Sequence, residues 1–541
     1  MHVGAAGKNP FLYLHQIGGS LNFAIDSHLT RFSPSFIFCT VLKESFAQAG
    51  DHVLRAERRR IQHEFQKVKI LPSDEKLTAQ TGLGVALEIL TKSPMMKEMV
   101  KTLPERVSHR SVGTWKLFAC LIAAHLEGVE SIQNMEELEG DPYLESLIGA
   151  SMPAPRTIVD YLADFEEHHI EGLNTFINQM GFALHSFVLE AHPELVTKNR
   201  IIDIDSTYHV HHGELFDGVA WNYKNEWSLE SQSAFSSLGF CHHVWLRPGN
   251  TKSGTDANQM IRNIFDTALT SKLRHFFHQD FVRMDSAFCD QNTIHACLER
   301  GTHFTITANK ATTFWHKLLE VQGVAWTAWV HDEKTIKQHE KAGYPLPQIE
   351  VGRIWWEPRW ANGTLRFPIL VKRTWKSFCK LKERHKVKSQ GELFNIDTVE
   401  ESGGWEYYAV VTNHDLTKSS YQDIMEFHQK RASSENMNKE QKFGYHLNNF
   451  PCQSLTANKA WMMSAMIAHN LLRFLSLMND PVHPQFARKT RRKFINFPAR
   501  LAERSRQIFL HVPLKFYQEV IQFIEGWRFP EKVFAHMFST A

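Results

Sequence analysis

Three carboxylates in this sequence stand where a fold could bring them together. Asp205 ends the short apolar run IIDID and Asp285 ends the run FVRMD, so each closes a segment typical of a buried strand. Glu435 lies in QDIMEFHQKRASSENMNKEQK, which we interpret as helical. Hard divalent cations prefer oxygen ligands, and two of them about 3.5–4 Å apart can activate water and stabilise the leaving oxygen of a phosphodiester. The three residues therefore fit the ligand set of two Mg²⁺ ions, for which Mn²⁺ can substitute, and we expect them to converge to metal-ligand distance.

The surroundings of Glu435 resemble the DDE transposases of bacterial insertion sequences, in the cut-and-paste group with a Tyr-Arg-Glu-Lys signature. In that signature a Tyr is followed by Arg three residues on, by the catalytic Glu four beyond that, and by Lys seven further. The corresponding residues here are His428, Arg431, Glu435 and Lys442. One of the four departs from the family, because His stands in place of Tyr. The resemblance covers residues 75 to 510 and is strongest at the three acidic motifs.

Asp203 competes with Asp205 for the first acidic position. Side chains alternate along a strand, so the two aspartates share a face and spacing alone does not choose between them. The family's first aspartate is followed within two residues by Thr, as in Asp205-Ser206-Thr207, so the resemblance favours Asp205. The family's second aspartate follows a strand and precedes a turn of small residues, and Asp285 with Ser286-Ala287 fits that pattern.

The resemblance implies a transposase that binds the terminal inverted repeats of its own mobile element. It would cleave DNA by two-metal hydrolysis and join the ends to target DNA, as a homodimer in the synaptic complex. Asp205, Asp285 and Glu435 would be the catalytic residues and metal ligands, while Arg431 and Lys442 would contact phosphates of the bound end. Two alternatives are a metal-dependent nuclease of the same fold without strand transfer, and an inactive DNA-binding remnant. The intact acidic triad speaks against the remnant.

Two further residues are assigned to DNA by the resemblance. His428 can donate a hydrogen bond to a phosphate, and with an ordinary imidazole pKa its contact would tighten as the ring protonates between roughly pH 6 and 7.5. Tyr408 begins the run Tyr408-Ala409-Val410-Val411-Thr412, at the place of a W-x-x-x-T strand whose aromatic residue stacks on a flipped base in relatives. Stacking on a base contributes ~1–3 kcal/mol and tolerates any aromatic ring. The alternative is a tyrosine buried between strands.

The periodicity of apolar residues predicts an α/β protein with a ribonuclease H-like catalytic core. Residues 76–195 carry apolar residues at three- and four-residue spacing, which predicts a helical domain suited to binding DNA ends. Strand and helix patterns alternate in 196–312, and we join 415–480 to this catalytic domain because it carries Glu435. Between them, 313–414 is rich in β-branched and aromatic residues bounded by Gly and Pro, which predicts a mostly β insertion domain.

The two ends of the chain and its composition add less. Residues 1–75 are a poorly legible extension, and 481–541 form a basic and aromatic C-terminal region. The net charge is only +3, but basic clusters at 55–60, 380–388 and 488–492 suit contacts with phosphates, with a solvated helix face as the alternative for each. The 541 residues contain seven cysteines, no C-x-x-C, no run of ~18 apolar residues and no secretory leader pattern. We therefore expect a cytoplasmic, nucleoid-associated protein without a membrane partner.

Overall fold

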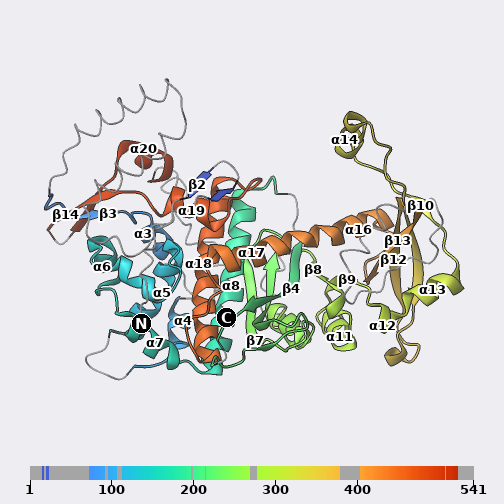
Figure 1. Cartoon of the computed structure of the whole chain (residues 1–541), viewed down its shortest axis with the longest axis horizontal. Helices are drawn as coiled ribbons and strands as arrows, with labels where there is room; N and C mark the ends of the chain where they lie inside the picture. The colour runs from blue at the N-terminus through green and yellow to red at the C-terminus, as the bar shows by residue number, and fades with distance from the viewer. Residues whose placement is uncertain are drawn as a thin grey trace, which may run out of the picture. The chain divides into compact units, whose positions relative to one another are not determined.

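The chain forms two compact units, residues 1–74 and 75–541. In the first unit, β1 (His15–Ile17) and β2 (Ser20–Asn22) pair as antiparallel strands. The second unit is the one that Figure 1 labels in most detail. The computed structural model describes residues 15–17, 20–22, 72–91, 96–106, 112–195, 199–213, 215–268, 277–377, 403–505 and 507–521.

The core of the second unit is a mixed sheet, which contains both parallel and antiparallel pairs of strands. Its central strands are β4 (Arg200–Val210), β6 (Trp227–Ser236), β7 (Cys241–Pro248), β8 (Asp280–Met284) and β9 (His303–Thr307). They lie in the order β7-β6-β4-β8-β9, with the short β5 (Ala220–Trp221) also on β6. β4, β8 and β9 are parallel to one another, β6 is antiparallel to β4, and β7 is antiparallel to β6. Strands buried on both faces explain the nearly continuous apolar runs at β4 and β8.

Two buried ion pairs set the register between β4 and β8. Arg200 lies opposite Asp280, and Asp203 lies opposite Arg283, so the charges are exchanged between the strands. Arg200 Nε is 2.7 Å from Asp280 Oδ1, and Arg283 Nε is 2.6 Å from Asp203 Oδ1. All four residues are buried. A slip of one residue would leave buried charges without partners, which is strongly destabilising, so these pairs specify one alignment.

The predicted insertion does not build a sheet of its own. Its strands β10 (Thr327–Ala328), β11 (Ile349–Trp356), β12 (Phe367–Ser377) and β13 (Gly403–Thr412) form an antiparallel run that continues the central sheet. The junction is the antiparallel pairing of β13 with β9, so the sheet has ten strands in all. The mixed α/β class predicted from the periodicity is confirmed. The continuity of these strands with the central sheet could not be predicted from the sequence, because it depends on the long-range pairing of β13 with β9.

Helices precede the sheet over the stretch that the sequence predicts as helical. They are α3 (Leu83–Thr91), α4 (Met96–Lys101), α5 (Thr114–Glu127), the 3-10 turn η1 (Gln133–Leu138), α6 (Pro142–Ile148), α7 (Pro155–Ala163) and α8 (Glu167–Ala191). Gly128 ends α5 in the left-handed conformation with φ of 89°, which a glycine adopts without strain. Between the strands lie α9 (Ala257–Ile264), η2 (Ser286–Phe288), α11 (Gln291–Glu299), α12 (Lys310–Thr313), α13 (Trp315–Gln322), α14 (Glu333–Ala342) and η3 (Arg359–Ala361).

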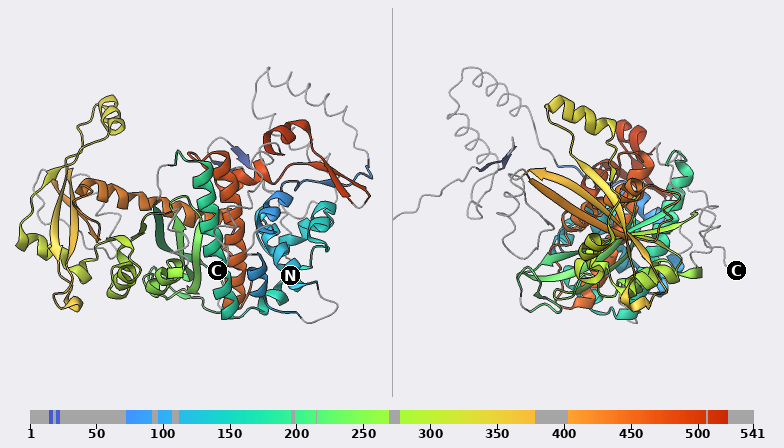
Figure 2. Two further views of the ribbon diagram at one scale, coloured as in Figure 1. Left: turned by 180° about the vertical axis from the view of Figure 1, so that it is seen from behind. Right: turned by 90° about the vertical axis from the view of Figure 1, so that its right-hand side faces the viewer.

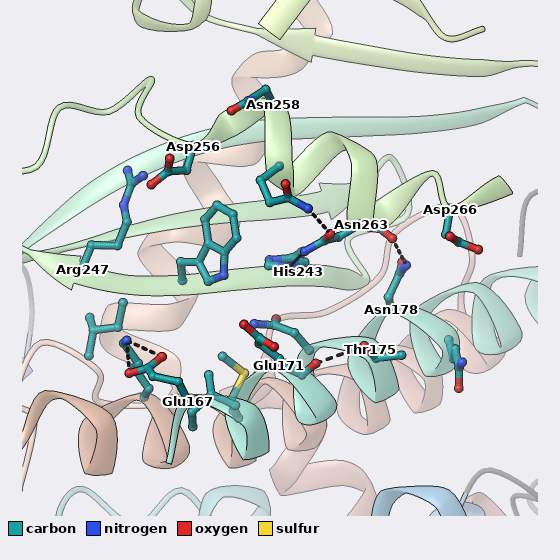
Figure 3. Close-up of a pocket in the computed structure, with 18 residues that line it drawn as sticks. Glu167, Glu171, Thr175, Asn178, His243, Arg247, Asp256, Asn258, Asn263 and Asp266 are labelled. Carbon is teal, nitrogen blue, oxygen red and sulfur yellow. Dashed lines mark hydrogen bonds and ion pairs between the residues drawn. The ribbon is translucent and has the colours of Figure 1, made fainter. Parts of the chain in front are cut away.

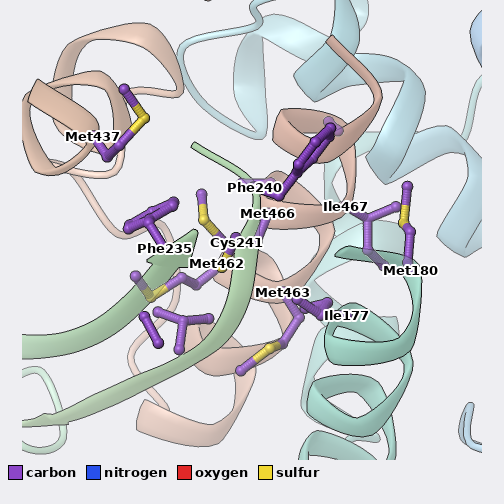
Figure 4. Packing of buried hydrophobic residues seen from close by; sticks show 14 of the residues in the cluster. Ile177, Met180, Phe235, Phe240, Cys241, Met437, Met462, Met463, Met466 and Ile467 are labelled. Carbon is purple, nitrogen blue, oxygen red and sulfur yellow. The ribbon is translucent and has the colours of Figure 1, made fainter. Parts of the chain in front are cut away.

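A methionine-rich helix, α18 (Leu455–Asn479), forms the centre of the core. It packs against α8, α5 and β7, and Figures 1 and 2 show α8 and α18 running side by side next to the sheet. Figure 4 shows its methionine side chains against residues of β6, β7 and α8, among them Met462, Met463, Met466, Phe235 and Ile177. Unbranched methionines fill such irregular gaps well. In the described part of the chain, no helix has the length and apolarity needed to cross a membrane.

The segment predicted to carry the catalytic glutamate consists of three short helical elements. α16 (Tyr421–Gln429) begins at Ser420, whose side chain accepts a hydrogen bond from the amide of Asp423 in a capping box. It continues through the 3-10 turn η4 (Lys430–Ser433) into α17 (Ser434–Gly444), which lies against β4. Figure 1 shows α16 and α17 in succession between the β10–β13 part of the sheet and β4.

The C-terminal region folds back on the helical region. After α19 (Ala487–Phe494), β14 (Ala499–Arg504) pairs with both β15 (Gln507–His511) and β3 (Leu77–Thr78) to give a second, three-stranded sheet. α20 (Leu514–Phe516) and η5 (Tyr517–Ile521) follow.

Candidate active site

Asp205 and Asp285 lie side by side on two neighbouring central strands of the sheet, Asp205 within β4 and Asp285 directly after β8. The parallel register pairs Ile204 of β4 with Met284 of β8, and each aspartate is the next residue along its strand. Neighbouring strands are about 4.7–4.9 Å apart, so their side chains belong to one site. The Asp285 carboxylate also accepts a hydrogen bond from the amide of Ala287 at 2.8 Å, which fixes the turn after β8.

The Asp205 carboxylate is mostly buried and has polar partners on both oxygens. Asn438 donates from Nδ2 to Oδ2 at 3.0 Å, and Arg431 Nη1 lies 3.7 Å from Oδ1. Burial raises the pKa of Asp205 to about 6, against the opposing effect of the Arg431 charge, and the carboxylates of Asp285 and Glu435 raise it further. Asp205 therefore interacts with two carboxylates and with the Arg431 guanidinium at the same time.

Glu435 stands in the first turn of α17 with an exposed side chain, close enough to raise the pKa of Asp205. Among the described residues, no three His, Cys, Asp or Glu side chains are gathered to hold one metal ion. The expected convergence to metal-ligand distance is thus not met in this structure. Instead, Arg431 and Asn438 contact the two oxygens of Asp205.

Asp203, the competitor of Asp205, has both of its oxygens bound by one arginine. Arg283 donates from Nε and Nη2 to the two oxygens at 2.6 and 2.7 Å, and from Nη1 to the backbone oxygen of Phe427 at 2.8 Å. Burial raises the pKa of Asp203 while the Arg283 charge lowers it. This pair joins β4 and β8 to the end of α16.

His428 lies inside the protein, at the end of α16. It is 1% exposed, and its Nδ1 is 2.9 Å from the Thr305 hydroxyl, while Nε2 is 2.9 Å from the Tyr408 hydroxyl and 3.0 Å from that of Thr307. Burial, helped by the charges of Arg431 and Arg283, lowers the pKa of His428 to about 3. The expected titration between pH 6 and 7.5 is therefore wrong for this structure. A DNA contact by His428 stays a prediction. In this structure the ring is buried and has no exposed face.

Tyr408 shares this network. Its hydroxyl bonds Thr307 at 2.9 Å as well as His428, and its half-buried ring packs against an apolar cluster formed by Val351, Leu370, Val410, Ile424 and Met425. Burial raises the pKa of Tyr408. This is the geometry of a tyrosine packed between strands and helix, and base stacking by Tyr408 stays a prediction.

The two cations of the signature both face β4. The Arg431 side chain is 17% exposed beside Asp205. Lys442 is half-buried and donates from Nζ to the backbone oxygen of Tyr208 at 2.5 Å. Burial lowers the pKa of Lys442, and Lys224 lowers it further. Arg431 and Lys442 thus both contact β4, Arg431 at Asp205 and Lys442 at Tyr208.

Comparison with known families decides what kind of protein carries this geometry. A family model described as Transposase DDE domain group 1 matches residues 63–522. The chain belongs to this family. The match spans the central sheet, the strands that extend it and all three acidic residues. No curated protein matches the chain. Family membership supports a transposase function in general, and DDE transposases generally use divalent metals.

The basic clusters of this transposase contribute unequally to the described structure. Residues 55–60 and 380–388 lie outside the described part of the chain. The third cluster lies on α19, where Arg491 is buried and donates to the backbone oxygens of Leu126, His125 and Gly444. Arg491 therefore serves packing, whereas Arg488 and Arg492 of the same cluster are exposed.

A cavity of about 770 Å³ lies between α8, β7, α9 and α18 (Figure 3). Its lining mixes polar and apolar side chains, with Glu171, Asn178, His243 and Asn263 among the residues drawn. None of the predicted site residues lines it, so it is separate from the candidate active site.

Two residues at the site were missed from the sequence. Arg283 could have been predicted, because a charged residue inside the apolar run FVRMD needs a buried partner. Asn438 could not, since an amide within a polar helical stretch is ordinarily solvent-facing. Only the packing of α17 on β4 shows it to be 7% exposed and bonded to Asp205.

The buried state of His428 predicts a specific acid sensitivity. The unfolded chain takes up a proton on this ring below about pH 6.5, whereas the folded protein resists protonation until about pH 3. Its share of the free energy of unfolding is therefore fully present above pH 6.5. That share is lost as the pH falls, by up to about 1.4 kcal/mol per pH unit. His428→Gln should lose this contribution.

We expect the free-energy difference between wild type and His428→Gln, measured by urea unfolding, to shrink by about 2 kcal/mol from pH 7 to pH 5. His483→Gln is the control for replacement of a histidine outside the core, because the His483 side chain is 80% exposed. A constant difference for His428→Gln would show that the ring is not buried and neutral.

Proposed function

We propose that the protein binds the terminal inverted repeats of its own mobile element, cleaves DNA by metal-dependent phosphodiester hydrolysis and joins the ends to target DNA. The observation that carries this proposal is the placement of Asp205, in the middle of β4, beside Asp285, which directly follows β8, within electrostatic reach of Glu435, in a member of the DDE transposase family. Double-stranded DNA, as element ends and as target, is the substrate, and the site of action is the cytoplasmic nucleoid.

The strand arrangement supports a ribonuclease H-like catalytic core. In the order β7-β6-β4-β8-β9, the strands β4, β6 and β7 form an antiparallel meander. β8 and β9 run parallel to β4 on its other side. The first aspartate then lies on the central strand and the second at the end of its parallel neighbour. In this scheme β10–β13 are an elaboration of the core between β9 and the helix of Glu435.

Asp205, Asp285 and Glu435 are the residues that would hold two divalent ions, Mg²⁺ or Mn²⁺. The donor set fits a hard cation, because it consists of carboxylate oxygens, and Asp285 and Glu435 lie close enough to Asp205 to raise its pKa in addition to the larger effect of burial. Ions bound there would supply Lewis-acid activation of water and stabilisation of the leaving oxygen. Asp203 is excluded from this role in our proposal because Arg283 occupies both of its oxygens.

The remaining signature residues position DNA. Arg431 keeps its charge at any physiological pH and is the nearest cation to Asp205, so it can exchange this carboxylate for a DNA phosphate when metal ions neutralise the site. We assign Lys442 to the same end, and exposed Arg488 and Arg492 of α19 to more distant phosphates. His428 and Tyr408, in their shared hydrogen-bond network, would shape the neighbouring surface. Pairing of two ends in a synaptic complex implies a homodimer.

The proposal is tested with Mg²⁺ in two reactions, one with uncleaved element ends to measure cleavage and one with pre-cleaved ends and a target plasmid to measure joining. Wild type should yield joined products. Asp205→Asn, Asp285→Asn and Glu435→Gln should each lower cleavage by more than about 100-fold, beyond the effect typical of residues that only support metal ligands, while end binding in a gel-shift assay is retained. Cleavage without joining would instead identify a nuclease, and binding without either reaction would identify an inactive remnant.

A second experiment separates Asp203 from Asp205 by combining cleavage with stability. Asp203→Asn weakens a buried ion pair, so its unfolding temperature should fall, but cleavage per folded molecule should remain substantial. Asp205→Asn should lose cleavage and gain stability at pH 7, by roughly 3 kcal/mol at most, because it removes a carboxylate whose pKa is raised to about 6. Loss of cleavage in folded Asp203→Asn with retention in Asp205→Asn would transfer the role to Asp203.

A further inference from the structure

We infer that Asn438 is a positioning residue of the acidic site, whose amide orients the Asp205 carboxylate and thereby sets the affinity of the site for divalent ions. The inference rests on the proposed metal-dependent function and names a residue outside the Tyr-Arg-Glu-Lys signature. It concerns one hydrogen bond, from Asn438 Nδ2 to Asp205 Oδ2 at 3.0 Å.

This hydrogen bond joins two of the elements that carry the site. Asn438 lies three residues after Glu435 on α17, and Asp205 lies on β4. The amide is neutral, so it can direct the carboxylate without competing for its charge, unlike the guanidinium of Arg431 on the other oxygen. With Oδ2 held by Asn438, the carboxylate plane has one preferred orientation.

The other end of the same amide adds nothing to folding. Asn438 is 7% exposed, and its Oδ1 is buried without a hydrogen-bond partner in the described structure. A buried acceptor left unpaired is unfavourable for folding, as is also the case for Oε1 of Gln441 on the same helix. What distinguishes Asn438 is therefore the hydrogen bond that its Nδ2 donates to the Asp205 carboxylate.

The neighbouring contacts of α17 show which function is special to Asn438. Gln441 and Lys442 follow at helical spacing on the same face, and they bind the Ser233 hydroxyl at 2.9 Å and the Tyr208 backbone oxygen. These contacts seat α17 on β6 and β4. Gln441 is a buried amide in the same seam whose Nε2 binds the Ser233 hydroxyl rather than a carboxylate, so it offers a matched control for the docking of the helix.

Partners that hydrogen-bond a ligating carboxylate typically change metal affinity by 10–100-fold when they are removed. We therefore expect the full-length Asn438→Ala protein to bind Mn²⁺ about 10-fold more weakly than wild type in calorimetric titrations at pH 7.5 without DNA. Asn438→Leu, which keeps the volume of the side chain, should show the same loss if the alanine variant folds poorly. Asp205→Asn should abolish binding.

Gln441→Ala should lower the unfolding temperature of the protein, as the Asn438 variants do, but leave its Mn²⁺ affinity within about twofold of wild type. Wild-type affinity in both Asn438 variants, or an equal loss in Gln441→Ala, would overturn the inference and reduce Asn438 to a docking contact. A wild-type protein that takes up no Mn²⁺ would overturn the metal-dependent function itself, and this inference with it. The two failures are thus distinguishable.

Discussion

The parallel pairing of β4 with β8 is the constraint on which the proposed site depends. Asp205 and Asp285 meet only because Ile204 is opposite Met284, and a slip of one residue would send one of them to the other face of the sheet. The exchanged pairs Arg200–Asp280 and Asp203–Arg283 make that slip costly. Buried ion pairs are weak evidence for stability, but a role in specifying register is well attested. In this protein the register places the two aspartates of the proposed site next to each other.

The same ion pairs tie the sheet to the helices around it. Arg200 lies over the rings of Phe182 and Phe265, while Arg283 stacks on Phe427 and binds its backbone oxygen. The end of α16 is thereby fixed to β8, and the hydrogen bonds of His428 fix it to β9 and β13. A buried polar network of this kind imposes one geometry where apolar packing would allow several. The departure of His428 from the signature Tyr thus has a structural explanation in its two threonine partners.

Much of the architecture could be predicted from periodicity and spacing. The helical stretch, the strand that precedes Asp285 and the helix of Glu435 all follow from local patterns, as does the buried character of α18. The first strand was predicted to end at Asp205 but continues to Val210. Even the register was legible in principle, because RIIDID and DFVRMD align with complementary charges at their first and fourth positions. The burial of His428 and of Asn438 could not be predicted, since each depends on partners more than 100 residues away. The joining of β13 to β9 is likewise a long-range pairing without a local signal.

The measurement that tests the account most directly is a crystal structure of the protein soaked in Mn²⁺ and recorded at the manganese absorption edge. The account predicts anomalous density bounded by the carboxylates of Asp205, Asp285 and Glu435, with Glu435 drawn toward the two aspartates and Arg431 displaced from Asp205. Anomalous density elsewhere, or none between these carboxylates while the Asp205–Arg431 contact persists at saturating Mn²⁺, would contradict it.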